Sequence, residues 1–350
     1  MLTDNEKKIY SRHIILDEIG LKGQEKLKQA KVLVVGAGGL GCPILQYLTA
    51  AGVGTIGIVD ADVVDVSNLH RQILYTIDDV GKPKALTASK RLKQLNPHVN
   101  FEVFQTFLST KNAINIFSEY DIIVDGSDNF QTRYLCNDAA VITNKPLVFG
   151  SIFKFEAQLS VFNYKNGPTY RCLYPTPPTA GSVPSCSDVG VLGVLPGIVG
   201  CYQANEVLKI ILEKGAVLSG KLLTFNVLNM EQMMFSFSKN EALKISALET
   251  DYNVFCGVEN PSESISIEIL NANKTAYNLL DVRESWERAQ HSIGGQHIPL
   301  GELANKYENI PTEKPLVVYC KSGIRSQKAI TFLQAYLPNT TLINLKNGIG

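Results

Sequence analysis

Short apolar runs recur through the first part of the chain, and longer stretches with apolar residues at helical spacing lie between them. The runs occupy residues 32–35, 55–59, 101–104, 121–124 and 147–149. Apolar runs that alternate with helices are typical of βαβ units, whose parallel strands are covered on both faces. The pattern therefore predicts an α/β fold with a Rossmann-like, mostly parallel sheet.

The pattern changes after residue 150. Residues 155–164, 221–228 and 230–237 alternate apolar and polar positions, which predicts an added antiparallel sheet that faces the substrate. Residues 166–190 are rich in Pro, Gly and Ser, so we expect a long irregular loop there. Residues 189–205 carry few charges but contain Pro and several Gly, which favours a buried or interface helix over a membrane span.

A polar, aperiodic segment at residues 239–263 predicts a linker that wraps on the first domain. We therefore expect one domain at residues 1–238 and a second at residues 264–350. The second domain has apolar runs at residues 266–270, 277–284 and 314–320. Helical stretches separate these runs, so they predict the strands of a small parallel α/β domain.

A glycine-rich turn follows the first strand and opens the next helix; its glycines are Gly36, Gly38, Gly39 and Gly41. Without a Cβ, the backbone N–H groups of such a turn can approach an anionic phosphate. Asp60 ends the second strand, at the spacing where a carboxylate accepts a hydrogen bond from a ribose hydroxyl. These features predict a nucleotide site, and most chains that carry the glycine pattern alone would bind NAD or FAD.

Charged residues beyond the turn favour a triphosphate. Asn68, Arg71 and Gln72 follow the second strand, and Lys84 lies near the start of the next helix. A triphosphate calls for more cations than a dinucleotide does, and for a metal ion; Arg71 and Lys84 can supply the cations. Asp128 follows the fourth strand at the edge where such sheets bind ligands, so it is either a Mg²⁺ ligand or the N-cap of the next helix.

A cysteine ends the last apolar run of the second domain. Cys320 precedes a short turn that contains Gly323, then Arg325 and a helical stretch. The N–H groups of the turn, the helix dipole and the cations Lys321 and Arg325 all favour a thiolate, so we predict a reactive Cys320. Asp281 and Arg283 are expected to form a structural ion pair under this turn.

The totals narrow the class of protein. At 350 residues, with 45% hydrophobic and 19% charged residues, the chain is long enough for two folded domains. The formal net charge is zero, so there is no electrostatic case for nucleic acid or for an anionic membrane. The seven cysteines are scattered and odd in number, and no apolar signal segment opens the chain, which favours a reducing cytoplasmic location.

Five spaced motifs in residues 10–237 resemble the MoeB, ThiF and HesA family, relatives of the ubiquitin-activating enzymes. They are YSRHIIL, G-x-G-G-x-G, D-x-D with S-N-L-x-R-Q, K-x-K and D-x-x-D-N. The resemblance implies ATP-dependent adenylation of the C-terminal Gly-Gly of a ubiquitin-like sulfur carrier protein. By motif position it implies that Gly41 faces the phosphates, Asp60 the ribose, Asn68, Arg71 and Lys84 the triphosphate, and Asp128 the Mg²⁺. It also implies a homodimer in which Arg12 reaches the partner's ATP.

The turn after Cys320 resembles the rhodanese active-site loop, and DVRESWE and HSIGGQHIPL resemble that family's two earlier motifs. The resemblance implies a persulfide on Cys320, with a cysteine desulfurase or thiosulfate as the sulfur donor. A phosphatase is the alternative for this loop. Only four residues separate Cys320 from Arg325, the shorter form associated with sulfur transfer, whereas phosphatase relatives have one more.

Two further cysteine features depend on the first resemblance. Most relatives carry two C-x-x-C pairs that hold a structural zinc, but here the tetrads begin with Thr169 and Asn253 and retain only Cys172 and Cys256. Structural zinc takes four N or S ligands, so no structural zinc is expected. Cys186 resembles the cysteine with which thiolating members bind the carrier covalently, and it precedes an apolar helical run that would favour its thiolate.

Three functions remain open on the sequence. The favoured one is a nucleotidyltransferase fused to a sulfurtransferase. The alternatives are a NAD- or FAD-binding oxidoreductase, and a non-catalytic carrier-docking protein with a separate rhodanese activity. Carriers for molybdopterin, thiamine, cysteine or tRNA thiolation all end in Gly-Gly, so the sequence leaves the pathway open.

Overall fold

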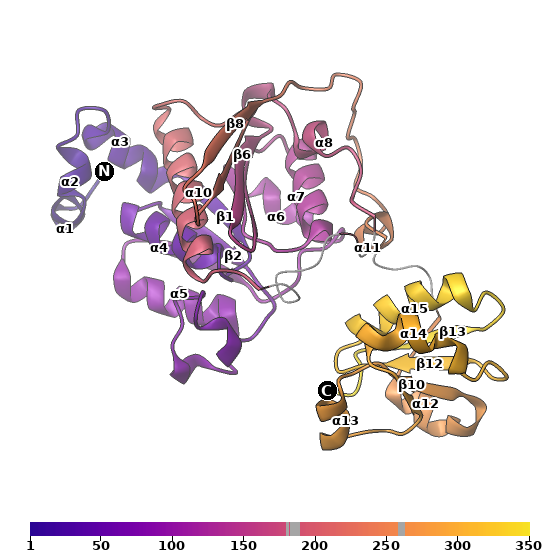
Figure 1. The fold of residues 1–350 in the computed structure, drawn as a ribbon. Helices are drawn as coiled ribbons and strands as arrows, with labels where there is room; N and C mark the ends of the chain where they lie inside the picture. Colours follow the sequence, from indigo (N-terminus) through magenta and orange to yellow (C-terminus); the bar gives the residue numbers. More distant parts are fainter. Residues whose placement is uncertain (180–181, 183–189, 258–262) are drawn as a thin grey trace. The chain divides into compact units, whose positions relative to one another are not determined.

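The computed structural model describes residues 1–179, 182, 190–257 and 263–350. The chain forms two compact units (Figure 1). The larger holds the described residues of Met1–Pro178 and Val183–Phe255, and the smaller those of Thr179–Ser182 and Cys256–Gly350. The division at Phe255 falls within the segment for which the sequence predicts a linker. Each unit has its own sheet.

An eight-stranded sheet organises the larger unit, in the order β3-β2-β1-β4-β5-β6-β7-β8. The strands are β1 Lys31–Val35, β2 Thr55–Val59, β3 Asn100–Phe104, β4 Ile122–Asp125, β5 Leu147–Phe153, β6 Glu156–Phe162, β7 Lys221–Asn226 and β8 Gln232–Ser236. The strands from β3 to β5 pair in parallel, as the apolar runs predict. The carboxyl ends of these strands therefore meet at one edge, where a ligand can bind.

The predicted antiparallel strands are present, but they do not form a separate sheet. β5 pairs with β6, β6 with β7 and β7 with β8, all antiparallel, so they extend the parallel sheet at one side. β5 continues past the parallel region to Phe153 and turns directly into β6. The same strand can therefore pair in parallel with β4 and antiparallel with β6. All five residues of β8, the outermost strand, are exposed.

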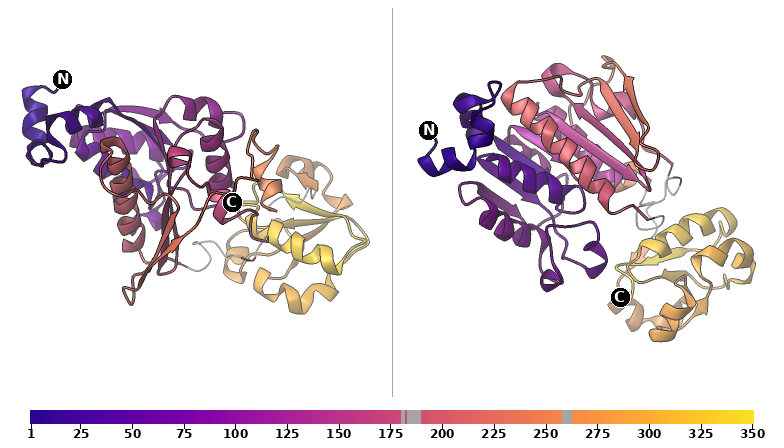
Figure 2. Two further views of the ribbon diagram at one scale, coloured as in Figure 1. Left: turned by 90° about the horizontal axis from the view of Figure 1, so that it is seen from above. Right: turned by 60° about the vertical axis from the view of Figure 1, so that its left-hand side comes forward.

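Helices cover both faces of this sheet, with α4, α5 and α10 on one face and α6 and α7 on the other (Figures 1 and 2). The helices among its described residues are α1 Asp4–Ile9, α2 Ser11–Ile14, α3 Gly20–Gln29, α4 Gly41–Ala51, α5 Lys84–Leu95, α6 Ala113–Ser118, α7 Phe130–Ile142, α8 Tyr170–Leu173, α10 Val194–Leu212 and α11 Tyr252–Phe255. Short 3₁₀ turns lie at η1 Val66–Asn68, η2 Ile77–Asp79 and η3 Tyr164–Asn166. Packing of α4 and α10 against the sheet buries a common core that includes Val32, Val34, Ile44, Leu48 and Val199.

Among its described residues, the expected irregular loop contains a short helix. α8 lies within residues 166–190, and its N-cap Thr169 forms a capping box with Cys172. Arg171 of α8 binds the buried carboxylate of Asp138 on α7, and Glu249 also accepts a bond from the same guanidinium. Asp138 and Glu249 hold this short helix in place. Both are distant from it in sequence, so no local pattern predicts these contacts.

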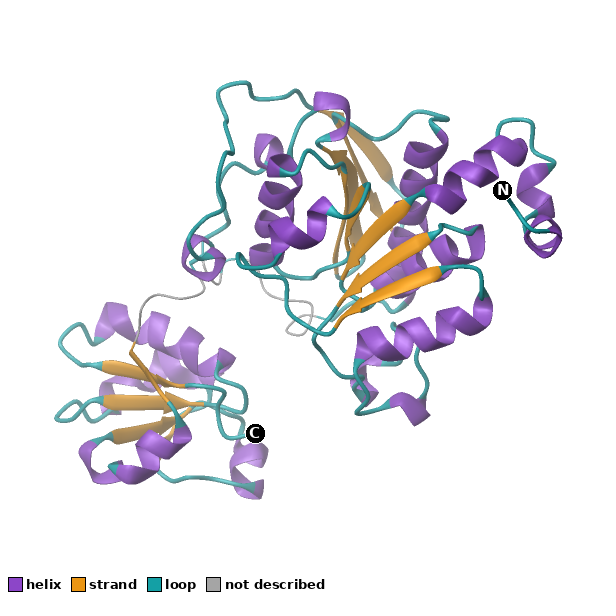
Figure 3. Cartoon of the chain, turned by 180° about the vertical axis from the view of Figure 1, so that it is seen from behind, coloured by secondary structure: helices purple, strands orange, loops and turns teal. Residues whose placement is uncertain are grey.

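A five-stranded sheet organises the smaller unit, and Figure 3 shows its strands together with the helices that cover them. The order is β11-β10-β12-β13-β9, and every pair is parallel. The strands are β9 Glu263–Ile265, β10 Asn278–Asp281, β11 Gln296–His297, β12 Leu316–Tyr319 and β13 Leu342–Leu345. The helices are α12 Ile267–Ala272, α13 Ser285–Gln290, α14 Leu303–Lys306 and α15 Ile324–Tyr336, with 3₁₀ turns η4 Lys274–Ala276, η5 Leu300–Glu302 and η6 Tyr307–Asn309.

One predicted strand of this unit is wrong. Residues 266–270 form the start of α12, and the strand β9 lies just before them. The Ser266 side chain accepts a hydrogen bond from the amide of Ile269, and Leu270 packs in the core. A Ser N-cap therefore decides the conformation against the apolar run, which is too short to separate helix from strand by periodicity.

Among the described residues, none of the helices combines the length and the apolar character that crossing a bilayer requires.

Candidate functional sites

The glycine-rich turn links β1 to α4 and lies against the end of β4. Gly36 has a positive φ of 94°, and a Cβ there would lie 2.9 Å from the carbonyl oxygen of Gly126. A Cβ on Gly41 would lie 2.0 Å from the carbonyl oxygen of Gly36. These two glycines let the turn close tightly, so the amino end of α4 faces the sheet edge.

A pocket opens at this edge, at the carboxyl ends of the parallel strands. Eight of the ten predicted nucleotide-binding residues line it: Gly36, Gly38, Gly39, Asp60, Arg71, Gln72, Lys84 and Asp128. Gly41 and Asn68 are not among the lining residues. Gly41 instead serves the packing of α4 on the turn, and Asn68 closes the η1 turn through a capping box with Asp65.

Asp60 is fixed at the end of β2 by two backbone donors. Its carboxylate accepts hydrogen bonds from the amides of Ala37 and Asp62, each at 2.8 Å. Burial raises the pKa of Asp60, and these bonds and the charge of Lys84 oppose the rise. Each oxygen retains a second lone pair, so the carboxylate can still accept a bond from a hydroxyl of a ligand.

The cations of the pocket are held by neighbours on the protein. Lys84 is buried at the first position of α5, and its Nζ lies 3.0 Å from Oδ2 of the exposed Asp62. Arg71 donates to the carbonyl of Ser67 at 2.9 Å. The buried Oε1 of Gln72 has no hydrogen-bond partner among the described residues, which points to a donor that a ligand would supply.

Asp128 is exposed and lines the pocket, and it does not cap α7. The cap is Asn129, whose Oδ1 accepts the amide of Thr132 at 2.9 Å. The structure thereby removes the N-cap alternative for Asp128. An exposed carboxylate at the sheet edge, free of a capping role, suits a hard cation such as Mg²⁺.

Arg133 is a pocket residue that the sequence reasoning missed. It is buried on α7, and its guanidinium lies over the rings of Phe130 and Phe149 at 5.3 and 5.7 Å from their centroids. The carboxylate of the fully buried Asp125 supplies opposite charge nearby, and burial raises the pKa of that carboxyl. Arg133 lies one helical turn after the D-x-x-D-N motif. This position is the one sequence signal that could have identified it as a pocket residue.

Two predicted catalytic residues have no assigned place in this pocket. Arg12 is exposed on α2 and is not among the residues that line the pocket of its own chain. Cys186 lies outside the described residues, so its prediction has no structural test.

The four positions that correspond to the zinc ligands of most relatives lie on or near the short helices α8 and α11. Cys172 accepts hydrogen bonds from the amides of Thr169 and Asn240, at 3.4 and 3.3 Å. Cys256 is buried, and Asn253 is exposed on α11. Among the described residues, no group of three or more His, Cys, Asp or Glu side chains is placed to hold a metal ion.

Cys320 lies at the end of β12 and is completely buried. Its Sγ accepts the amide of Gly323 at 3.1 Å, and the hydroxyl of Ser326 lies 3.5 Å away. Gly323 has a positive φ of 86° and begins α15, so the turn aims its N–H groups at the sulfur. Burial raises the pKa of Cys320, but the bonds from Ser326, Ser322 and Gly323 outweigh it and lower the pKa below the ordinary value. This is a site for a nucleophilic thiolate.

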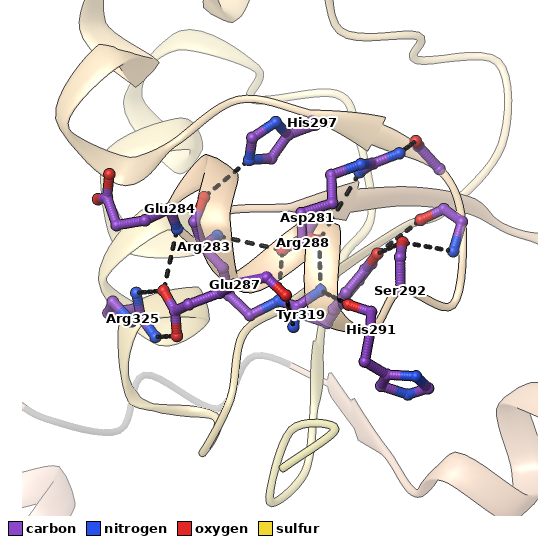
Figure 4. A network of polar contacts seen from close by, with 12 residues as sticks. Asp281, Arg283, Glu284, Glu287, Arg288, His291, Ser292, His297, Tyr319 and Arg325 are labelled. Carbon is purple, nitrogen blue, oxygen red and sulfur yellow. Dashed lines mark hydrogen bonds and ion pairs between the residues drawn. The ribbon is translucent and has the colours of Figure 1, made fainter.

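A network of charged residues supports the turn (Figure 4). Asp281 and Arg283 form the predicted ion pair, with Nε and Nη2 donating at 2.9 and 2.7 Å. Arg325 does not donate to the sulfur. Its Nη1 and Nη2 each donate to the carboxylate of Glu287 on α13 at 2.6 Å.

Comparison with known families divides the chain in the same way. Residues 10–245 match the ThiF family, and residues 266–350 match the rhodanese-like domain.

Curated relatives cover most of the chain. A sulfur carrier protein adenylyltransferase of Thermus thermophilus is 50% identical over 73% of this chain and 98% of its own length. A probable adenylyltransferase/sulfurtransferase MoeZ of Mycobacterium tuberculosis is 42% identical over 94% of this chain and 88% of its own length. The adenylyltransferase and sulfurtransferase MOCS3 of Danio rerio is 41% identical over 93% and 79%. Among solved structures, Escherichia coli MccB with a MccA peptide has a TM-score of 0.61 at 21% identity, over 69% of this chain and 74% of that one, which shows a shared fold.

Proposed function

Because the chain belongs to the ThiF family and carries a rhodanese-like domain after the ThiF part, we propose that it is an adenylyltransferase joined to a sulfurtransferase. Its substrate would be a ubiquitin-like sulfur carrier protein with a C-terminal Gly-Gly. One observation carries the proposal: the same chain holds a pocket lined by cations and by the exposed carboxylate of Asp128, and a buried thiol that accepts an N–H bond in the Cys320 turn. Adenylation needs the first site and sulfur transfer needs the second.

The residues of the pocket suit MgATP. Phosphate oxygens would be neutralised by the amino end of α4 and by the cations Arg71 and Lys84. Asp60 would accept a hydrogen bond from a ribose hydroxyl. Asp128 would hold Mg²⁺, which neutralises phosphate charge when bound. The carrier carboxylate would attack the α-phosphorus, and pyrophosphate would leave. Positioning and charge stabilisation account for most of such a step.

Cys320 would then supply sulfur. The terminal sulfur of its persulfide attacks the acyl-adenylate carbonyl, AMP leaves, and an acyl disulfide links the carrier to Cys320. A second thiolate must then attack the Cys320 sulfur of that disulfide, so that the carrier leaves as the thiocarboxylate. A disulfide forms between the attacking cysteine and Cys320, and a thiol reductant must reduce it before the next turnover. Cys186 is our candidate for this step. The persulfide itself would come from a cysteine desulfurase or from thiosulfate.

Two exposed apolar surfaces of the larger unit are our candidates for binding the carrier and a second copy of the chain. Met233 and Phe235 alternate with Met234 along β8, so they share one face of the strand, and both are exposed. This pair is our candidate surface for the body of the carrier. Val194 and Tyr202 of α10 are also exposed, and we assign that face to a second copy. In such a homodimer, Arg12 would reach the partner's nucleotide. The scattered cysteines favour a reducing compartment such as the cytoplasm.

ATP–pyrophosphate exchange with each candidate Gly-Gly carrier tests the proposal, because adenylation is reversible and needs no sulfur. We expect exchange that depends on one carrier and falls by at least about a hundredfold in Asp128→Ala, which removes the proposed metal ligand. Asp78→Ala is the control, since Asp78 is equally exposed but does not line the pocket.

Two outcomes would favour the alternatives. Tight NAD binding without any exchange would support a dinucleotide oxidoreductase, and carrier binding without ATP use would support a docking protein.

Cys320→Ser should retain exchange and lose thiocarboxylate formation. Loss of both activities in Cys320→Ser would contradict the separation of the two reactions.

A further inference from the structure

Arg325 is one of two cations at the Cys320 turn, and the carboxylate of Glu287 binds it. The guanidinium is part of α15, the carboxylate is part of α13, and two bonds of 2.6 Å join them end to end (Figure 4). This fork-to-fork arrangement is the geometry in which arginine binds oxyanions such as sulfate, phosphate or thiosulfate. The carboxylate of Glu287 therefore stands where such an anion would bind.

The pair is closed and ionised under ordinary conditions. Hydrogen bonding to Arg325 lowers the pKa of Glu287 to about 2, despite the burial of the carboxyl. Glu287 also accepts the amide of Glu284 at 3.0 Å, as the N3 residue of a capping box on α13. Both interactions fix the carboxylate, so it neutralises Arg325 at every pH near neutrality.

The thiol is stabilised without Arg325. Its Sγ accepts the amide of Gly323 at 3.1 Å and lies 3.5 Å from the Ser326 hydroxyl, whose shorter contact is with the acceptor Oδ1 of Asn344 at 2.7 Å. Lys321 is the other cation of the turn, and it is exposed. A solvated ammonium binds an anion weakly compared with a partly buried guanidinium such as that of Arg325, which can bind an anion through two N–H groups.

We propose that Glu287 determines sulfur-donor specificity by withholding Arg325 from oxyanions, which disfavours thiosulfate relative to organic persulfides. This rests on the proposed function, in which Cys320 receives sulfur. In the favoured reaction the Cys320 thiolate attacks the terminal sulfur of R–S–SH, and a new S–S bond forms. The S–S bond of the donor breaks, the donor leaves as the thiolate RS⁻, and the proton stays on the transferred sulfur.

The surroundings of the pair suit an organic donor. Trp286, directly before Glu287, is 64% exposed, and Ile324, directly before Arg325, is 65% exposed. Exposed apolar side chains cannot bind a small hydrated dianion through hydrogen bonds or charge. They can contact an organic group that carries a persulfide.

Protection of Cys320 by sulfate tests this inference without any sulfur transfer. Cys320 of the full chain is alkylated with iodoacetamide at constant ionic strength while sulfate replaces chloride. We expect weak protection in the wild type, and a fall of at least about threefold in the half-protecting sulfate concentration in Glu287→Gln, because Gln keeps the cap but not the charge. Strong protection of the wild-type protein would overturn the inference, and that measurement needs no variant to fold.

Two further variants separate the arginine from general charge effects. In the double variant with Glu287→Gln and Arg325→Gln the gained protection should disappear. Glu302→Gln makes the same change of charge at an exposed pair with Lys306 and should leave protection at the wild-type level. Equal protection in wild type and Glu287→Gln, or a gain that persists without Arg325, would refute the role of Glu287.

Loading of Cys320 with sulfur gives the second readout. With thiosulfate, Glu287→Gln should lower KM by at least about threefold, whereas KM for cysteine persulfide should stay unchanged. An unchanged KM for thiosulfate would also refute the inference. A protein that accepts sulfur from neither donor would refute the proposed sulfur transfer, while the sulfate measurement would still decide on Glu287.

Discussion

Single residues in both units owe their chemistry to the groups that surround them. Cys320 is completely buried, which by itself would keep its thiol protonated, yet its pKa is lowered because N–H and O–H donors converge on the sulfur. Asp128 is left open for a ligand because its neighbour Asn129 takes the capping role. In each case the residue type was visible in the sequence, whereas the partners that set its role came from the fold.

Removal of the Ser326 hydroxyl should shift the reactivity of Cys320 to higher pH. A lowered pKa keeps the thiolate present as the pH falls, so wild-type alkylation slows only at a pH below the ordinary thiol range. Ser326→Ala removes one donor and raises the pKa, so its alkylation should begin to slow at a higher pH. The pH profile of Cys320 alkylation, followed by mass spectrometry, measures the shift.

Thr331→Ala is the matched control, because its hydroxyl lies on the same helix and donates to the carbonyl of Gln327. A profile of Ser326→Ala that coincides with that of Thr331→Ala would mean that the backbone amides alone set the pKa.

At the scale of elements, the β1–α4 turn shows glycines with different tasks. Gly41 lies against the carbonyl of Gly36, whereas a Cβ on Gly38 would meet only Nε2 of Gln72, at 3.6 Å. The sequence pattern predicted one phosphate-binding loop and could not divide these tasks, because they depend on how closely the helix approaches the strand.

Gly41→Ala should destabilise the larger unit, and Gly38→Ala should not. The added methyl at position 41 would overlap the Gly36 carbonyl, which we expect to cost about 3 kcal/mol of the free energy of unfolding. Urea denaturation measures the difference between the two variants. Equal stability of both would show that the turn relaxes around the new side chain.

At the scale of the whole molecule, the position of Arg12 raises the question of the assembly. Arg12 is exposed on α2 and is absent from the pocket of its own chain. If the chain forms the proposed homodimer, each nucleotide site takes Asp128 from one protomer and Arg12 from its partner.

A mixture of two inactive variants should therefore regain activity. Arg12→Ala and Asp128→Ala should each lose exchange, but in a mixed dimer one site has both residues intact. Equal mixing makes half of the dimers mixed, with one intact site each, so about a quarter of the wild-type exchange should return. No recovery after dissociation and reassociation, despite proven mixing, would place Arg12 outside the partner's site.

The sequence by itself determined the parallel strands, the sheet edge where the pocket opens, the two-part organisation and the positions of Asp60, Asp128 and Cys320. It could do so because apolar runs, glycine spacing and ordered motifs are local along the chain. Only the tertiary structure decided that β6, β7 and β8 extend the parallel sheet, that residues 266–270 begin a helix, that Arg133 lines the pocket and that Glu287 occupies Arg325. Hydrogen bonding between strands and pairing between buried charges join residues far apart in sequence, and no local pattern encodes which partners will meet.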